Sequence, residues 1–420
     1  MDLRRCAATL TSCKRREMGI WPAITICALV VIAEGYDLIV YGALLPSLLQ
    51  EPGWELTRAG AGTLGSAAYV GMLVGALVVG RLSDRFGRRP FVLGSVAWFT
   101  VWTIACGMAG TPWHLGAFRL LAGIGMGAVL PVVLALAREL APADRTGVVF
   151  TVLMAGLPSG GMLASLTGLV VLPTAGWRAM FFIGGAASAI ILIMAFMRLP
   201  DSADFSDQAP EPIKLSVLFA PGLLINTMLF PLANLMMLLT WYGLNTWLTT
   251  LMRDLSYPLS SALQFSTMLN LGALAGSFAL AALCLHWGTR RTAGLGALLT
   301  SVGILGCVLH PDNAVLFLGL IALIGAGAHS ALNLITASVA DAYPAALRAS
   351  AIGWTHGVGR IGAIVSPLLG GWILAAGLGP AMVLGTFMVT ALLGSMFMGM
   401  LSLRGRTAEL SAGMSAKEAN

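Results

Sequence analysis

Long apolar runs, interrupted by short polar segments, dominate the chain from about residue 20 to residue 402. A run of about 20 apolar residues is long enough to cross the hydrocarbon core of a bilayer as an α-helix. The pattern predicts twelve such helices, with both termini on one side of the membrane. The predicted helices span 20–49, 59–80, 90–109, 113–137, 147–172, 178–198, 217–250, 259–285, 291–310, 314–338, 349–376 and 380–402.

One longer polar interval separates the first six predicted helices from the last six. It reads RLPDSADFSDQAPEPIK, and its Pro, Ser and Asp content is typical of a linker. The sequence therefore predicts five parts: an N-terminal segment over 1–19, a six-helix bundle over 20–198, a linker over 199–216, a second six-helix bundle over 217–402 and a tail over 403–420.

The two halves repeat weakly at an offset near 201 residues. Tyr41-Gly42 matches Tyr242-Gly243, and Gly87 matches Gly288. Two six-helix halves related by a repeat, with a binding site at their interface, are the plan of many secondary transporters.

The composition supports a membrane protein. Hydrophobic residues make up 58% of the chain and charged residues 10%, and the mean hydropathy is +0.87. A soluble protein is about a quarter charged, so we predict an integral membrane protein in contact with the lipid bilayer. The six cysteines lack the spacing of a disulfide framework or of a metal site, so no metal is expected.

The charged residues orient the predicted helices. The formal net charge is +6 and the isoelectric point is near 9.2, a balance that nucleic-acid-binding proteins also show. Here the Lys and Arg residues gather on the side of the termini, and the opposite loops hold only Arg58, Arg178 and Arg253. Such asymmetry marks the cytoplasmic side. We therefore predict a multi-pass inner (plasma) membrane protein with cytoplasmic termini and no nucleic-acid partner.

The loop between the second and third predicted helices reads GRLSDRFGRR, from Gly80 to Arg89. Its glycines permit a tight turn, and a solvated basic loop would explain the arginines but not Asp84 or the glycine spacing. The segment resembles the G-x-L-x-D-R-x-G-R-R loop of the major facilitator superfamily. This resemblance implies a gating loop that contains Gly80, Asp84, Arg85, Gly87, Arg88 and Arg89.

The fourth predicted helix contains FRLLAGIGMG, from Phe118 to Gly127. The segment is similar to the R-x-x-x-G-x-G-x-G pattern of the same superfamily, and its glycines would let helices approach closely. Arg119 lies about two helical turns from the predicted periplasmic end. It either extends outward to the membrane surface or pairs with an acid in the interior.

Two acids lie within the first predicted helix, in the stretch VVIAEGYDLIVYG. A charge at the bilayer centre costs about 2.5–3.5 kcal/mol on insertion scales, so Glu34 and Asp37 require either a function or a fixed network. They are i, i+3 neighbours, Tyr41 continues the same helix face, and Asp37 lies at a depth comparable to that of Arg119. Two close carboxylates resist simultaneous ionisation. We expect one of them to hold a proton near neutral pH, as proton coupling requires.

A narrower resemblance spans almost the whole chain. EGYD followed by LIVYGALLPSLL looks like the D-G-x-D signature of the aromatic acid:H+ symporter family within the superfamily, and GVGRIGAIVSPLLGG resembles that family's eleventh helix. Glu34 stands where the family usually has Asp. The resemblance implies functional positions at Glu34, Asp37, Asp84, Arg119, Glu139 and Arg360.

Arg360 is predicted about 18 Å into the eleventh helix, near the membrane midplane. Its repeat partner is Ser159, so the internal symmetry does not require an arginine there. A guanidinium fits a carboxylate, so Arg360 either binds the substrate or belongs to a structural ion pair. Further side chains could shape an aromatic slot with it or could pack without binding: Tyr41, Trp241, Tyr242, Asn245, His329 and Asn333.

Together these features predict an all-α membrane protein of the major facilitator fold, with twelve transmembrane helices in two pseudo-symmetric six-helix bundles. The resemblance implies a monomeric, proton-coupled transporter, without a cofactor, that imports a small aromatic carboxylate of the benzoate, hydroxybenzoate or phenylpropanoate type by alternating access. Glu34, Asp37 and Arg119 would couple the proton, and Arg360 with the aromatic slot would bind the substrate.

Other functions stay open on the sequence alone. A symporter of another organic acid or of a sugar would share the fold, as would a proton-driven exporter of drugs or metabolites, although AGLPSGG in the fifth helix lacks the exporter pattern G-P-x-x-G-G. A membrane-embedded enzyme would need clustered catalytic residues, but the five histidines are dispersed and no H-E-x-x-H or G-x-S-x-G motif occurs. A receptor that does not transport is a further alternative, but no sensor domain or long soluble region in the sequence supports it.

Overall fold

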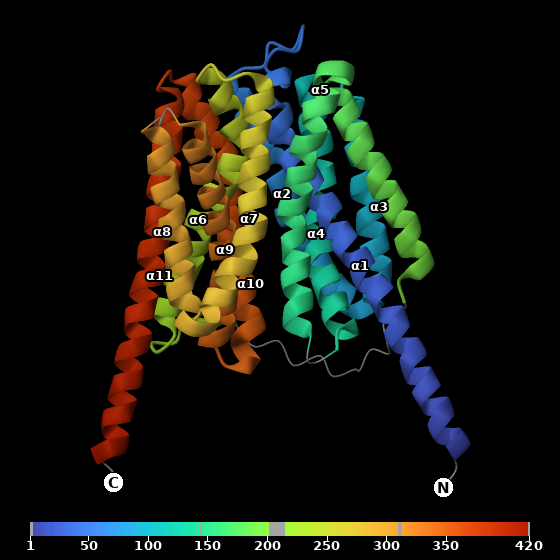
Figure 1. Cartoon of the computed structure of the whole chain (residues 1–420), viewed down its shortest axis with the longest axis vertical. Helices are drawn as coiled ribbons and strands as arrows, with labels where there is room; N and C mark the ends of the chain where they lie inside the picture. Colours follow the sequence, from blue (N-terminus) through green and yellow to red (C-terminus); the bar gives the residue numbers. More distant parts are fainter. Residues whose placement is uncertain (1–2, 143–144, 201–214, 310–312, 419–420) are drawn as a thin grey trace. The chain divides into compact units, whose positions relative to one another are not determined.

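The computed structural model describes residues 3–142, 145–200, 215–309 and 313–418, without the side chains of 3–20, 79–86, 215 and 404–418. Most of the predicted linker (199–216) therefore lies outside the described residues. The described residues form eleven α-helices and one short 3-10 helix (Figure 1). The first half contains α1 (Leu3–Leu48), α2 (Arg58–Phe86), α3 (Arg88–Gly107), α4 (Pro112–Leu140) and α5 (Thr146–Arg198). The second half contains η1 (Leu215–Phe219), α6 (Leu224–Asp254), α7 (Leu259–Trp287), α8 (Thr289–Val308), α9 (Ala314–Ala342), α10 (Ala345–Ala375) and α11 (Gly379–Glu418).

Eleven helices within the described ranges are long and apolar enough to cross a membrane. α5 accounts for two of the twelve predicted spans, because its 53 residues are interrupted by a non-helical backbone at Gly176, where φ is 72° and ψ is −179°. The two arms correspond to the predicted helices 147–172 and 178–198. Both arms appear in green in Figure 1.

The predicted start of the seventh helix is wrong. The seventh helix was predicted from residue 217, but α6 begins at Leu224 and the short 3-10 helix η1 precedes it. Pro221 and Gly222 lie between the two elements, and both residues disfavour a continuous helix at this point.

Matching helices of the two halves have equal lengths, as the internal repeat of the sequence predicts. α2 and α7 each contain 29 residues and begin at residues 58 and 259, and α3 and α8 each contain 20 residues and begin at residues 88 and 289. The glycine that precedes α3, Gly87, has φ 93° and ψ 149°, and its counterpart Gly288 before α8 has φ 81° and ψ 157°. The repeat that the sequence suggests therefore includes a matching turn that favours glycine.

The chain divides into two compact units. Unit 1 comprises residues 1–40 and 67–207, and unit 2 comprises residues 41–66 and 208–420. In unit 1, α3 packs on α4 and α5; in unit 2, α6 packs on α10 and α11, and α9 packs on α7 and α8. The two units differ from the two predicted bundles in one segment, because the end of α1 and the start of α2 pack with α6 and α10.

Backbone contacts explain why this segment joins unit 2. A Cβ atom at Gly42 would overlap the carbonyl oxygen of Asn245 in α6, and one at Gly62 would approach the carbonyl oxygen of Pro367 in α10. Glycine lets each pair of helices approach this closely. The segment from Tyr41 to Ser66 is therefore fixed on α6 and α10.

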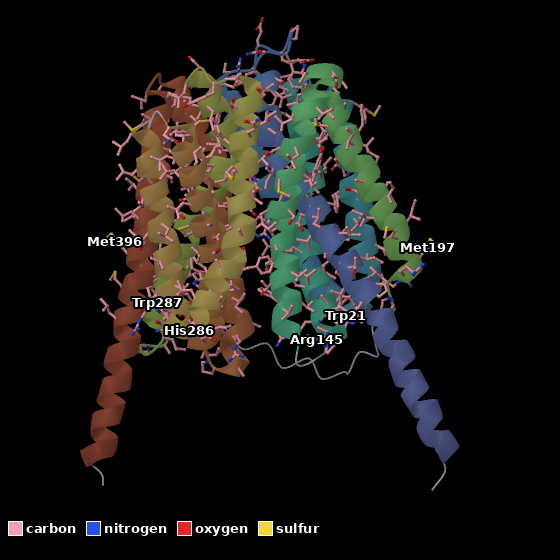
Figure 2. The ribbon with its side chains drawn as sticks, in the orientation of Figure 1. Trp21, Arg145, Met197, His286, Trp287 and Met396 are labelled. Atoms are coloured by element: carbon pink, nitrogen blue, oxygen red, sulfur yellow. The ribbon has the colours of Figure 1, made fainter. Side chains whose placement is uncertain are left out.

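Large apolar side chains cover the outer surface of both units. Met197 of α5, Trp287 of α7 and Met396 of α11 are all more than half exposed (Figure 2). Exposed apolar area of this extent is unusual in a soluble protein and is expected where helices face lipid.

Candidate functional site

A buried acid–arginine pair joins three helices of unit 1. Asp37 of α1 is 2% exposed and Arg119 of α4 is 1% exposed. Nη1 of Arg119 lies 3.5 Å from Oδ2 of Asp37 and donates to the backbone carbonyl oxygen of Asp37 at 2.7 Å. Thr103 of α3 donates its hydroxyl hydrogen to Oδ1 of Asp37 at 3.0 Å. Arg119 thus pairs with an interior acid and does not extend outward; its part in proton coupling stays a prediction.

Glu34 lies one helical turn before Asp37 and is fully buried, at 0% exposure. Packing within unit 1 fixes the helix that carries both acids. A Cβ atom at Gly35 would overlap the carbonyl oxygen of Leu157 in α5, and the hydroxyl of Tyr36 donates to the carbonyl oxygen of Met180 at 3.1 Å. The two acids are therefore held at a fixed position in the interior of the unit.

Part of the predicted gating loop is anchored within unit 1. Arg88 forms an ion pair with Glu139 at the end of α4, with 2.9 Å between Nη2 and Oε1. Arg89 donates to the carbonyl oxygen of Phe196 in α5 at 2.8 Å. Both arginines therefore tie the start of α3 to the ends of α4 and α5. The side chains of 79–86 lie outside the described residues, so the positions Gly80, Asp84 and Arg85 stay predictions without structural detail.

Unit 2 contains a band of polar and aromatic side chains on α6, α7 and α9. Trp241 of α6 stacks at a tilt against His329 of α9, with 5.3 Å between ring centroids. His329 Nδ1 lies 3.0 Å from the hydroxyl oxygen of Ser277 and 3.4 Å from Nδ2 of Asn333. The structure therefore brings together three residues of the predicted slot, Trp241, His329 and Asn333.

Nε2 of His329 is available for one further hydrogen bond. Nδ1 lies 3.0 Å from the hydroxyl oxygen of Ser277, which also donates to the carbonyl oxygen of Ala273 at 2.8 Å. The single hydroxyl hydrogen of Ser277 serves one of these two contacts, so Nδ1 of the neutral ring either accepts from Ser277 or donates to it. Among the residues whose side chains are described, no group forms a hydrogen bond with Nε2. In either tautomer Nε2 can form one hydrogen bond with a further group.

The band continues through two asparagines. Asn245 of α6 donates to the carbonyl oxygen of Trp241 at 2.9 Å, and its own Oδ1 accepts from Nδ2 of Asn270 in α7 at 3.2 Å. The sequence analysis missed Asn270 and Ser277. Their spacing from Ser266, four and eleven residues along α7, places all three on one helix face and could have identified them. We call Trp241, Asn245, Asn270, Ser277, His329 and Asn333 the polar band.

Arg360 differs from Arg119 in having no acidic partner. It is half-buried on α10, and within the described part of the chain no carboxylate lies within ion-pair distance of it. One turn earlier, Nε2 of His356 lies 3.0 Å from the hydroxyl oxygen of Thr336 in α9. The structural ion pair that the sequence left open for Arg360 is thus absent from the described residues.

The two predicted tyrosines occupy matching positions of the repeat, Tyr41 in α1 and Tyr242 in α6. The hydroxyl of Tyr41 donates to the carbonyl oxygen of Ala61 at 2.6 Å and so joins α1 to α2 within unit 2. Tyr242 is half-buried on α6, next to Trp241. Substrate binding by either tyrosine stays a prediction.

An ion pair that the sequence analysis did not identify lies at the end of α6. Arg58, the first residue of α2, forms two hydrogen bonds with the carboxylate of Asp254, one of them at 2.9 Å between Nη2 and Oδ1. In the same unit, Nε1 of Trp247 donates to the carbonyl oxygen of Pro367 at 3.0 Å. These contacts hold the start of α2 and the ends of α6 and α10 together.

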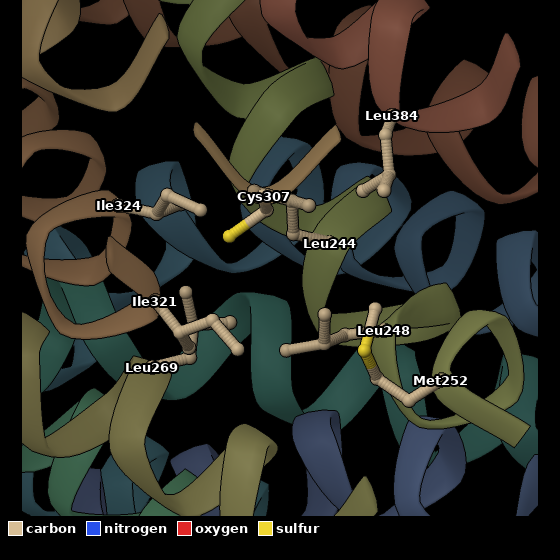
Figure 3. A pocket seen from close by; sticks show the side chains of 8 residues that line it. All are labelled: Leu244, Leu248, Met252, Leu269, Cys307, Ile321, Ile324 and Leu384. Atoms are coloured by element: carbon tan, nitrogen blue, oxygen red, sulfur yellow. The ribbon is translucent and has the colours of Figure 1, made fainter. Parts of the chain in front are cut away.

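A small cavity inside unit 2 does not fit an aromatic substrate. Its volume is about 10 Å³, room for about one water molecule, and it is lined only by apolar side chains of five helices (Figure 3). The lining residues are Leu244, Leu248, Met252, Leu269, Cys307, Ile321, Ile324 and Leu384. The polar band and Arg360, rather than this cavity, hold the groups that could recognise a carboxylate or a hydroxyl.

Comparisons with known proteins identify the family of the chain. The model of the Major Facilitator Superfamily matches residues 27–286 and 232–417. The chain is 41% identical to the gentisate transporter of Corynebacterium glutamicum, over 83% of this chain and 80% of the relative. It is 31% identical to the benzoate transport protein of Acinetobacter baylyi, over 84% of each.

The fold is also that of a solved transporter. The crystal structure of a D-xylose-proton symporter superimposes with a TM-score of 0.72 over 90% of this chain and 97% of that chain, at 18% identity. At this identity the likeness concerns the fold alone. The sequence matches and the fold together show that this multi-pass membrane protein belongs to the Major Facilitator Superfamily and, within it, to the aromatic acid:H+ symporter family.

Proposed function

We propose that this protein imports a small aromatic carboxylate together with one or more protons, by alternating access. The observation that carries the proposal is the half-buried guanidinium of Arg360, which has no carboxylate within reach among the described residues. A cation within a membrane-spanning helix is costly unless an anion neutralises it. A substrate carboxylate would supply that anion, and the planar guanidinium would bind it through two hydrogen bonds.

The polar band supports an aromatic substrate. Trp241 and His329 provide ring faces in unit 2, and Nε2 of His329 can form one further hydrogen bond. A sugar would leave Arg360 without a counter-charge, so the charge of Arg360 favours an acid over a sugar. The relatives named for gentisate and benzoate support the same choice.

The acid pair of unit 1 supports proton coupling. Glu34 and Asp37 are buried one turn apart, and Arg119 and Thr103 contact Asp37. A carboxyl group that loads a proton from one side and releases it to the other couples transport to the proton gradient. Arg119 would respond to that change, because its electrostatic attraction to Asp37 exists only while Asp37 is ionised.

The proposal includes the orientation of the protein and the role of the loop before α3. With both termini in the cytoplasm of a monomer in the inner membrane, the ion pair Arg88–Glu139 lies on the cytoplasmic side, where the loop from Gly80 to Arg89 would act as a gate. The ion pair Arg58–Asp254 then lies on the opposite side.

Uptake by proteoliposomes tests the proposal. Purified protein is reconstituted, an inward proton gradient is imposed, and accumulation of radiolabelled benzoate, 4-hydroxybenzoate and 2,5-dihydroxybenzoate is measured. Weak acids also cross bilayers unaided, so protein-free liposomes and liposomes with the Arg360→Ala variant are the controls. We expect accumulation well above both controls that collapses with a protonophore. Uptake equal to that of protein-free liposomes for all three acids would contradict the proposal.

A further inference from the structure

One side-chain carbonyl group of the polar band accepts no hydrogen bond from the part of the chain that the structure describes. Asn270 of α7 is fully buried, at 0% exposure, and both hydrogens of its amide nitrogen are used. Nδ2 donates to the carbonyl oxygen of Ser266 at 2.9 Å and to Oδ1 of Asn245 at 3.2 Å. Its Oδ1 accepts no hydrogen bond from the described residues.

The orientation of this amide is fixed by its neighbours. Both partners of Nδ2 are oxygen atoms that can only accept, because Asn245 uses its own Nδ2 to donate to the carbonyl oxygen of Trp241. Turning the Asn270 amide by 180° would place its oxygen against two acceptors. Oδ1 of Asn270 is therefore fixed as an acceptor without a donor. A buried acceptor that forms no hydrogen bond destabilises the protein.

The position of Asn270 connects this acceptor to the proposed substrate site. Asn245 links it to Trp241, whose ring lies against that of His329. An aromatic ring that contacts Trp241 could extend a polar substituent toward Asn270. The group that satisfies a lone carbonyl oxygen is an O–H or N–H donor, and on the ring of an aromatic acid the common donor is a phenolic hydroxyl.

α1 lies directly on α6 at the level of Asn245, because a Cβ atom at Gly42 would overlap the backbone carbonyl oxygen of Asn245. The side chains of Asn245 and Asn270 are buried, at 3% and 0% exposure. The neighbouring helices must therefore move before a ligand can reach the two asparagines. Such a movement fits a site that opens to one side of the membrane at a time.

We propose that Oδ1 of Asn270 accepts a hydrogen bond from a ring hydroxyl of the transported acid, so that the protein selects hydroxylated aromatic acids over unsubstituted benzoate. The inference rests on the proposed function and refines its substrate class. A site built to bond a hydroxyl discriminates against the analogue that lacks it, because the buried acceptor then stays unpaired.

Binding titrations of the purified protein test this role. The probes are benzoate, the three monohydroxybenzoates, 2,5-dihydroxybenzoate and the methyl ethers of these phenols. We expect at least one hydroxylated acid to bind about tenfold more tightly than benzoate and than its own methyl ether, the size of one net hydrogen bond. Asn270→Leu, which is close in size, should abolish this advantage while benzoate affinity changes by less than about threefold.

A matched substitution separates this role from general damage. Asn234→Leu changes another buried asparagine of unit 2, whose amide nitrogen donates to the carbonyl oxygen of Thr355. Its Oδ1 also accepts no hydrogen bond from the described residues, but Asn234 forms no hydrogen bond with the polar band, so the variant controls for the loss of a buried amide elsewhere in the unit. It should keep the preference for hydroxylated acids. A preference that survives in Asn270→Leu would overturn the inference and leave Asn270 as the partner of a buried water only.

The outcomes also separate this inference from the proposed function. Equal binding of benzoate, the phenols and the methyl ethers by the wild type would overturn the role of Asn270 and leave aromatic acid transport intact. Absence of binding by every acid would remove both. If Asn270→Leu does not fold, a wild-type structure with bound 2,5-dihydroxybenzoate decides, because the inference requires a ligand hydroxyl within hydrogen-bond distance of Oδ1.

Discussion

Each unit holds an arginine within a membrane-spanning helix, and the two arginines differ in whether a carboxylate lies within reach. In unit 1, Arg119 is 1% exposed and contacts both the carboxylate and the backbone carbonyl of Asp37. In unit 2, Arg360 is half-buried and no carboxylate of the described residues lies within ion-pair distance. The neighbouring polar groups differ as well, because unit 2 offers amides, rings and an imidazole where unit 1 offers acids.

This difference favours separate functions for the two arginines. A charge that is already paired inside its own unit can respond to protonation of its partner, whereas a charge without a partner is available to an anion from outside the chain. The arginine of unit 1 then belongs to proton coupling and that of unit 2 to substrate binding. Three sets of substitutions test this contrast.

The largest effect is expected from Asp37→Asn. This variant cannot exchange a proton at position 37, so accumulation driven by a pH gradient should be abolished while the protein still reaches the membrane. Gradient-driven uptake into proteoliposomes is the measurement. Asp254→Asn is the matched control, because it removes the carboxylate partner of Arg58 in unit 2. This variant should retain coupled uptake. Normal accumulation by Asp37→Asn would remove Asp37 from the coupling mechanism.

The second effect concerns stability without substrate. Arg119→Ala leaves Asp37 buried without its ionic partner, and breaking a buried pair in this way typically costs about 3–5 kcal/mol. Arg360→Ala leaves no acid of the described residues unpaired, so its unfolding temperature in detergent should stay near that of the wild type. Thermal unfolding of both variants compares the two sites directly. Equal losses of stability would show that the two arginines are equally embedded in their units.

The smallest effect is expected from Thr103→Val. Its hydroxyl donates to Oδ1 of Asp37 at 3.0 Å. Without this bond the carboxylate of Asp37 loses one of its fixed partners, so gradient-driven uptake into proteoliposomes should fall by about tenfold or less, the size of one net hydrogen bond. Thr250→Val removes a buried hydroxyl of α6 that has no partner among the described residues, and it should leave uptake unchanged. Equal losses of uptake in the two variants would contradict a role of Thr103 at Asp37.

Much of the fold could be predicted from the sequence, because the apolar spans are set by local composition. The twelve spans, the repeat and the kink between the two arms of α5 follow from apolar length and from glycine or proline at the boundaries. The assignment of the segment from Tyr41 to Ser66 to unit 2 could not be predicted. It depends on the contacts of Gly42 and Gly62 with carbonyl oxygens more than 200 residues away, which no local pattern reveals.

The candidate site shows the same limit. The pairing of Arg119 with Asp37 was one of two alternatives that the sequence left open, and the matching depths of the two charges supported it. Asn270, Ser277 and the ion pair Arg58–Asp254 were missed, since each becomes significant only through a neighbour on another helix. Charges within apolar helices are conspicuous in a sequence, whereas an amide that is left with one unpaired oxygen is visible only in three dimensions.

The central claim is that Arg360 binds the carboxylate of the substrate, and titration of an acid and its amide tests it most directly. Benzoate and benzamide are titrated against the wild type, Arg360→Lys and Arg360→Ala. Loss of one partner of a buried charge pair costs about 2–5 kcal/mol, so Arg360→Ala should weaken benzoate binding by roughly 30- to several-thousand-fold. Arg360→Lys keeps the positive charge but lacks the planar guanidinium that forms two hydrogen bonds, so its benzoate affinity should lie between those of the wild type and Arg360→Ala. Benzamide should lose little in either variant; equal losses for the acid and the amide would contradict the claim and make Arg119 the next candidate.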